Sequence, residues 1–122
     1  MLNKIRLELA RTPQRPDGAS DIGYEFAAPL TGGGKIDAKA WEKTRDHCRV
    51  VRFRPGEEDD IGHLVRRPGG SWAFHYDIHS DDEDDESGYR FGDHIFRVGE
   101  YVSVREDDEL VTYQVKQVQP VS

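Results

Sequence analysis

Apolar and polar residues alternate along several short stretches of this chain, the pattern of strands that have one face in a protein core. The alternation is clearest in residues 4–9 (KIRLEL), 72–79 (WAFHYDIH) and 110–118 (LVTYQVKQV). Turn-forming residues separate the stretches. With the shorter runs 89–91 and 95–98 included, the pattern predicts about seven or eight short antiparallel strands. A mainly β fold of this spacing indicates a small barrel or a sandwich.

One segment, residues 37–47, has the pattern of a short α-helix instead. Asp37 is a favourable N-cap, and Ile36 before it with Trp41 after it fits a hydrophobic staple. Trp41 and Cys48 then fall on one side at helical spacing. We therefore expect one helix that covers an end of the sheet structure and is attached to it through Trp41.

Composition limits the chain to one folded unit. Its 122 residues have the size of a single domain, so we expect residues 1–122 to share one core. That core must be small, because only 35% of the residues are hydrophobic and 34% are charged. The acidic run at 81–86 (DDEDDE) lacks the glycine spacing of a calcium-binding loop, so it is predicted to be a solvated acidic loop.

The charge is negative overall and unevenly distributed. The net charge is −7, with 11 Lys or Arg and 7 Asp or Glu in residues 1–56 but 6 and 17 in residues 57–122. Nucleic acid is therefore an unfavourable partner for the whole molecule, because phosphate contacts need a basic face. No stretch reaches the roughly 20 apolar residues of a membrane span. With Cys48 as the single cysteine, these features predict a cytoplasmic protein that does not enter a membrane.

Six segments form one further pattern across nearly the whole chain: residues 23–30 (GYEFAAPL), 34–37 (GKID), 61–65 (IGHLV), 72–77 (WAFHYD), 99–104 (GEYVSV) and 112–115 (TYQV). Together they resemble a small family of uncharacterised bacterial proteins. The resemblance implies a bacterial protein of one domain. It implies nothing about activity, and no functional residue is carried over from it.

The segment His75-Tyr76-Asp77-Ile78-His79 is the sharpest candidate for a chemical site. On a strand, His75, Asp77 and His79 share one face, and two imidazoles with a carboxylate are ligands of catalytic zinc and non-haem iron. The opposite face is apolar, so the three residues also fit the solvent side of an ordinary half-buried strand. We expect no cofactor, and a divalent metal at these residues is the alternative.

Arginines on neighbouring predicted strands form a second candidate site: Arg49, Arg52, Arg54, Arg66 and Arg67. Small barrels bind single-stranded nucleic acid through such surfaces, although the acidic runs nearby favour salt bridges within the protein. The same surface, or an exposed strand edge, also suits a protein partner, because sheets bind peptides by edge pairing.

Motifs of catalysis fail their spacing tests. Gly32-Gly33-Gly34-Lys35 lacks the first glycine and the Ser or Thr of a phosphate-binding loop, and no serine has the G-x-S-x-G pattern. We therefore expect a non-enzymatic binding or protein-interaction module of the small-barrel kind, with an unknown protein partner. A metal-binding protein or metalloenzyme and a single-stranded nucleic-acid binder are the two alternatives.

Overall fold

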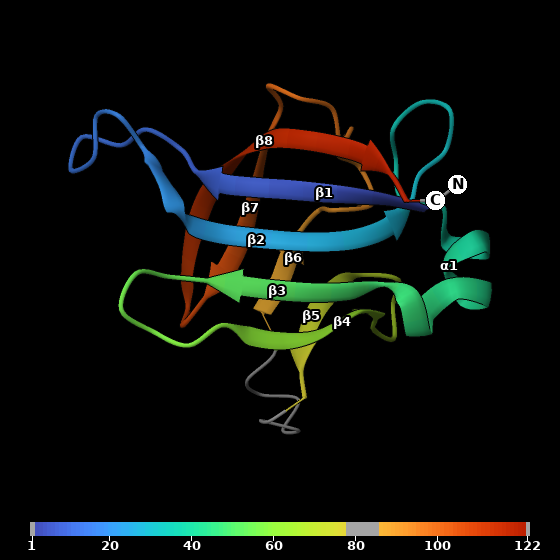
Figure 1. Cartoon of the computed structure of the whole chain (residues 1–122). Coiled ribbons are helices and arrows are strands. Elements are labelled where there is room, and N and C mark those ends of the chain that lie inside the picture. The colour runs from blue at the N-terminus through green and yellow to red at the C-terminus, as the bar shows by residue number, and fades with distance from the viewer. Residues whose placement is uncertain (1, 78–85, 122) are drawn as a thin grey trace.

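The sheet of this protein closes on itself (Figure 1). The computed structural model describes residues 2–77 and 86–121. Its elements are β1 Leu2–Leu9, β2 Ala19–Pro29, α1 Ala38–Thr44, the 3-10 helix η1 Arg45–His47, β3 Arg49–Phe53, β4 Asp60–Arg66, β5 Trp72–Tyr76, β6 Glu86–Tyr89, β7 Tyr101–Glu106 and β8 Glu109–Pro120. Each strand pairs antiparallel with the next, and β8 pairs with β1. The predicted mainly β fold with one short helix is confirmed, as a barrel.

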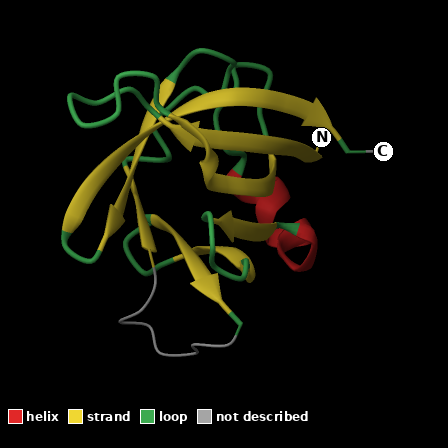
Figure 2. Ribbon diagram, turned by 60° about the vertical axis from the view of Figure 1, so that its left-hand side comes forward, coloured by secondary structure: helices red, strands yellow, loops and turns green. Residues whose placement is uncertain are grey.

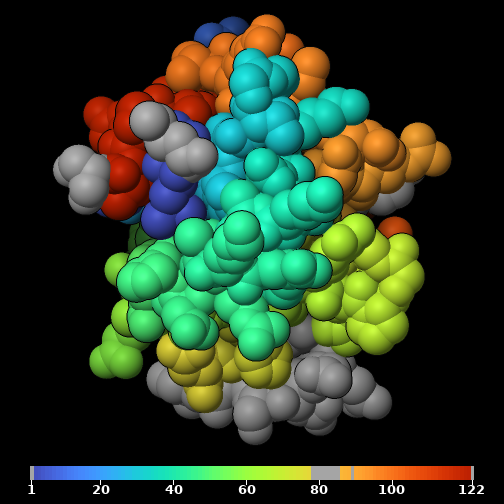
Figure 3. Space-filling view, turned by 90° about the vertical axis from the view of Figure 1, so that its right-hand side faces the viewer, coloured from blue at the N-terminus to red at the C-terminus, as the bar shows by residue number. Residues whose placement is uncertain are grey.

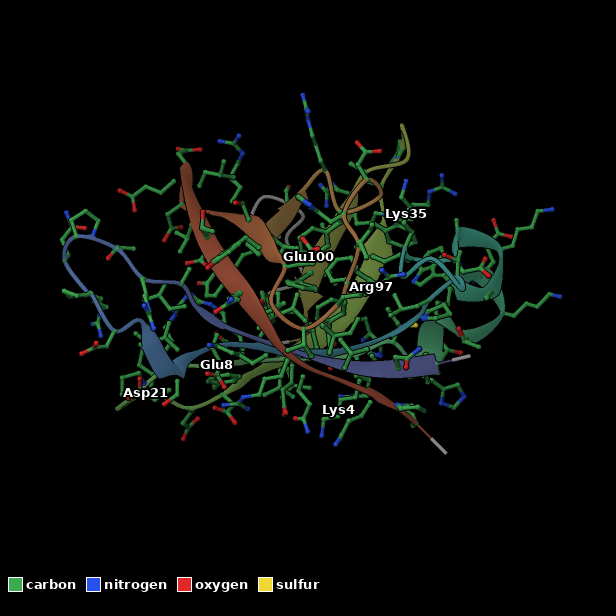
Figure 4. The ribbon with its side chains drawn as sticks, turned by 90° about the horizontal axis from the view of Figure 1, so that it is seen from above. Lys4, Glu8, Asp21, Lys35, Arg97 and Glu100 are labelled. Carbon is green, nitrogen blue, oxygen red and sulfur yellow. The ribbon has the colours of Figure 1, made fainter. Side chains whose placement is uncertain are left out.

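Alternation directs one row of side chains from each strand into the barrel. On β1, Ile5 and Leu7 are fully buried, whereas Lys4 and Glu8 belong to the outer face (Figure 4). The interior of a barrel of about eight strands is just wide enough for side chains to fill it. Aromatic rings fill much of this one, and the rings of Phe26 and Phe74 lie 5.2 Å apart at its centre.

The two ends of the barrel are built differently. α1 and the connection 90–99 lie at one end, which we call the helix end (Figure 1, Figure 2). The β3–β4 loop, residues 54–59, and the β7–β8 turn at Asp107 and Asp108 lie at the other, which we call the hairpin end. Both turn aspartates have positive φ angles, as a two-residue hairpin turn requires.

The helix forms where the sequence predicts it. Asp37 caps it by accepting a hydrogen bond from Ala40 N at 3.2 Å, and Ile36 and Trp41 are both buried. Trp41 attaches the helix to the barrel, because its Nε1 donates to Leu64 O at 3.0 Å. Among the described residues, no helix has the length and apolar character needed to cross a membrane.

The strands predicted at 89–91 and 95–98 are wrong beyond Tyr89, which is the last residue of β6. Residues 90–99 form no strand. Arg90 has a positive φ angle that ends β6, and Phe91 and Phe96 then turn into the core. Phe96 N donates to Gly34 O at 2.8 Å, so this connection lies beside the glycine-rich loop, and Figure 4 shows Lys35 and Arg97 on the two neighbouring segments.

The predicted acidic loop 81–86 is wrong at its last residue. Glu86 is the first residue of β6 and is buried inside the barrel, and residues 81–85 lie outside the described part of the chain.

The expected strand edge is also wrong. Each of the eight described strands pairs with a neighbour on both sides, so closure leaves no edge strand for a peptide to join.

The packing of β6 against Phe91 gives a direct test of the closed helix end. A methyl group on Gly88 would lie 2.4 Å from Cγ of Phe91, so we expect Gly88→Ala to destabilise the protein by about 1–3 kcal/mol through overpacking. Gly92→Ala is the matched control, because its methyl would meet only Trp72 Nε1, at 3.7 Å. Urea denaturation measures both, and equal stability of the two variants would contradict this packing.

Candidate functional site

Polar side chains meet inside the barrel at the hairpin end. Each continues an inward-facing row, as Tyr76 does after Phe74 on β5 and Glu106 does after Val104 on β7. We call this group the Tyr–Glu cluster, and its members are Tyr24, Arg52, Arg54, Tyr76, Glu86, Glu106 and Tyr113. The cluster joins side chains from β2, β3, β5, β6, β7 and β8 and the start of the β3–β4 loop.

Glu86 is the inner carboxylate of the cluster. Its Oε1 accepts a hydrogen bond from the Tyr76 hydroxyl at 2.6 Å and lies 2.9 Å from the Tyr24 hydroxyl. Its Oε2 lies 3.4 Å from Nε of Arg52, but that nitrogen forms no hydrogen bond. Burial raises the pKa of Glu86, and the Tyr76 hydrogen bond and the Arg52 charge lower it by less.

Glu106 has a richer set of donors. Its Oε1 accepts from Nη2 of Arg54 at 2.9 Å, and its Oε2 accepts from the hydroxyls of Tyr24, at 2.5 Å, and of Tyr113. A guanidinium and hydroxyl donors together suit a carboxylate, because charge-assisted hydrogen bonds are about twice as strong as neutral ones. Glu106 is therefore the well-satisfied acid of the pair.

The other members of the cluster keep their protons. Burial raises the pKa values of the Tyr24, Tyr76 and Tyr113 hydroxyls above the ordinary tyrosine value, so all three remain donors. Burial lowers the pKa of Arg52, but the acidic groups around it, Glu86 first, raise it by more. Arg52 also donates from Nη1 to Oδ2 of Asp60 at 3.3 Å.

A small polar hollow lies beside the cluster at the hairpin end. It has a volume of about 170 Å³ and is lined by Arg52, Arg54, Glu57, Glu58 and Asp60. Both arginines already bind acidic residues of this chain, so the lining offers few donors to a ligand. We therefore interpret the cluster as an internal network of the hairpin end.

An apolar depression near the helix is a different site. A groove of about 410 Å³, which we call the helix groove, lies between the helical segment and the outer faces of β4 and β5. Its lining comprises Trp41, Leu64 and Val65 together with Arg45, Asp46, His63, Arg66 and His75. Arg45, Asp46 and Arg66 are exposed, and Trp41 is buried, so the groove has an apolar base and a charged rim.

The structure places two of the three predicted metal ligands on the outer face of β5 and just after it. His75 faces outward and pairs in register with His63, and Asp77 lies 3.6 Å from Arg49 and 3.4 Å from His63 Nδ1. His79 lies outside the described residues. Within the described ranges, no three His, Cys, Asp or Glu side chains are placed to hold a metal ion. The metal site at His75, Asp77 and His79 stays a prediction.

The five predicted partner-binding arginines do not share one surface. Arg52 and Arg54 point inward at the hairpin end, where they bind Glu86, Asp60 and Glu106. The other three are divided between the outer face of the barrel and the helix end: Arg49, Arg66 and Arg67. Arg66 lies over the Trp72 ring, with its guanidinium carbon 5.7 Å from the ring centroid. Salt bridges within the protein, the interpretation favoured by the acidic runs, account for the inner two.

Sequence reasoning missed the Tyr–Glu cluster, although one signal was present. Arg52 and Arg54 lie two and four positions after the buried Val50, and Glu106 lies two positions after the buried Val104. Alternation therefore already placed these charged residues on the inner face. Glu86 gave no such signal, because its five acidic predecessors made it look like part of a loop.

The cluster predicts unequal effects for two conservative tyrosine changes. Tyr113→Phe removes a donor to the Glu106 carboxylate, so we expect a loss of about 1–3 kcal/mol of unfolding free energy. Tyr101→Phe is the matched control at 56% exposure, and we expect it to change stability by less than about 0.5 kcal/mol. Chemical denaturation measures both, and a neutral Tyr113→Phe would show that the cluster is not a stabilising network.

Known proteins give no further guide to the site. Comparison of the chain with family models, with curated proteins and with solved structures finds no match in any of the three. Function is therefore inferred from the contacts, burial and charges of this chain's own residues.

Proposed function

We propose that this protein is a non-enzymatic interaction module that binds an acidic segment of a partner protein in the helix groove. The observation that carries the proposal is the composition of the groove, an apolar base formed by Trp41 and Val65 beneath the exposed Arg45 and Arg66. The partner's segment would place an apolar side chain in the base and carboxylates on the rim. Closure of the barrel supports a groove rather than a strand edge as the binding mode.

Charge separation along the barrel supports an acidic partner despite the net charge of −7. On the helical segment and around the groove, the exposed basic side chains outnumber the exposed acidic ones, with Lys39, Lys43, Arg45 and Arg66 against Glu42 and Asp46. The hairpin end carries exposed acidic side chains in its loop and turn: Glu57, Glu58, Asp59, Asp107, Asp108 and Glu109. The β3–β4 loop and the β7–β8 turn therefore repel an acidic segment, and the basic side chains around the helix groove attract it, which guides its approach.

The base of the groove is held in place before any partner arrives. Trp41 is hydrogen-bonded to Leu64 O and packs edge-on against Trp72, with ring centroids 5.3 Å apart. Arg66 lies over the Trp72 ring, which limits its freedom as well. Binding to a preorganised surface loses less side-chain entropy than binding to a mobile one.

The placement of the arginines supports a protein partner over single-stranded nucleic acid. A nucleic-acid surface needs a continuous basic path beside aromatic faces. Arg52 and Arg54 are instead committed to Asp60, Glu86 and Glu106 at the opposite end of the barrel from Arg66. The groove and its rim are short, which suits a single peptide segment.

Binding of a defined peptide tests the proposal. The probe is a fluorescently labelled peptide of glutamates around one central leucine, and the readout is its anisotropy on titration with the protein at low salt. We expect binding that weakens as salt rises, and the double variant Arg45→Glu/Arg66→Glu should lower the affinity at least about tenfold, the equivalent of about 1.4 kcal/mol.

The control variant has the same net charge as the test variant. Arg11→Glu/Arg15→Glu reverses two exposed arginines in the β1–β2 loop, at the hairpin end, and should leave the affinity within about twofold of the wild type. A peptide in which lysine replaces each glutamate should not bind. Equal losses in the two double variants, or equal binding of both peptides, would refute the groove as an acidic-segment site.

A further inference from the structure

The Tyr24 hydroxyl lies between two carboxylates but has only one hydrogen. Its oxygen is 2.9 Å from Oε1 of Glu86 and 2.5 Å from Oε2 of Glu106. A hydroxyl can donate that hydrogen along one of these directions, and the remaining contact then joins two oxygens that both carry lone pairs. If both carboxylates were ionised, one of these two buried contacts would be unfavourable. A second hydrogen, supplied by one of the acids, makes both contacts hydrogen bonds.

We propose that the Tyr–Glu cluster is a proton-binding site, and that the folded barrel holds one additional proton on Glu86 at neutral pH. The protonated Glu86 donates to the Tyr24 oxygen, and Tyr24 in turn donates to Glu106. Tyr76 and Tyr113 donate to Glu86 and Glu106 from the two sides. Every hydroxyl in this chain of hydrogen bonds then has a single acceptor.

The donors around the two acids place the proton on Glu86 rather than Glu106. Glu106 accepts from a guanidinium as well as from two hydroxyls, an environment that favours the charged form. Glu86 is close to Arg52 without a hydrogen bond from its Nε, and burial raises the pKa of Glu86. The neutral acid is therefore the better form at Glu86, and Glu106 serves as the acceptor.

The balance of charges around the cluster also favours a proton on Glu86. The cationic groups are Arg52 and Arg54 from β3 and its following loop, and the acids are Asp60 from β4, Glu86 from β6 and Glu106 from β7. The groups from β2, β5 and β8 are neutral tyrosine hydroxyls, and the buried side chains of β1 are apolar. Three acids against two guanidinium groups leave one excess negative charge, which a proton on Glu86 removes.

The proton makes folding depend on pH in a predictable direction. The folded-state pKa of Glu86 is above the ordinary value of a glutamate, which applies to the unfolded chain. The folded state therefore binds more protons between these two values, and the stability that the proton contributes is complete below the unfolded pKa. It is lost as the pH rises through the folded pKa of Glu86. Within that window the unfolding equilibrium constant grows by at most about tenfold per pH unit from this group.

Carbon-13 NMR of the wild-type protein tests the site directly. The carboxyl carbon of Glu86, assigned by its absence in Glu86→Gln, should have the shift of a protonated acid at neutral pH and should titrate only at higher pH. The exposed Glu109 serves as the internal comparison. An ionised Glu86 at neutral pH would overturn the proposal.

Urea denaturation across the same pH range supplies an independent readout. Glu86→Gln retains a neutral side chain of the same shape, so its stability should lack the loss with rising pH that the wild type shows. Glu109→Gln should keep the wild-type pH dependence. If Glu86→Gln folds and retains the full wild-type slope, or if wild type and Glu86→Gln diverge on acidification instead, the proton does not reside on Glu86.

Discussion

The register between β1 and β8, with Ile5 opposite Val118 and Leu7 opposite Val115, decides which face of each strand lies inside the barrel. The two valines are three positions apart, so in a regular strand their side chains would lie on opposite faces. An irregularity in β8 between them allows both valines to pair with the inward-facing residues of β1. A shift of one residue would expose the whole buried row of β1. Closure in this register therefore fixes the interior that every site in the molecule depends on.

That interior is apolar at one end and polar at the other. Toward the helix end, Phe91 stacks on Phe26 and Phe96 packs edge-on against both rings, and these contacts need no polar partner. Toward the hairpin end, hydroxyls, carboxylates and guanidinium groups satisfy one another across the barrel. Buried polar groups are stable only when they are paired, so this end of the barrel must be specific about its contacts. On the outer surface, the β3–β4 loop and the β7–β8 turn of the hairpin end carry exposed acidic side chains.

Local signals predicted the parts of this fold that depend on neighbouring residues. The alternation around Phe74 and Tyr113 identified strands, and the Asp37 cap with Trp41 identified the helix. The Tyr–Glu cluster could not be found in that way, because Tyr24 and Glu106 are 82 positions apart and meet only after closure. The prediction of an acidic loop was wrong at Glu86 for a related reason, because the composition of the run 81–86 does not distinguish its last residue from the others. Whether one acid of that run turns inward is set by the pairing of β6 with β5 and β7.

Backbone NMR at the β1–β8 seam tests the central claim, that the sheet is closed, most directly. Cross-strand nuclear Overhauser effects are expected between Ile5 and Val118 and between Leu7 and Val115, with slow hydrogen exchange of the β1 amides that pair with β8. Rapid exchange along that side of β1, with no cross-strand effects to β8, would show an open sheet. An open sheet would leave the Tyr–Glu cluster without the enclosure that its buried contacts require.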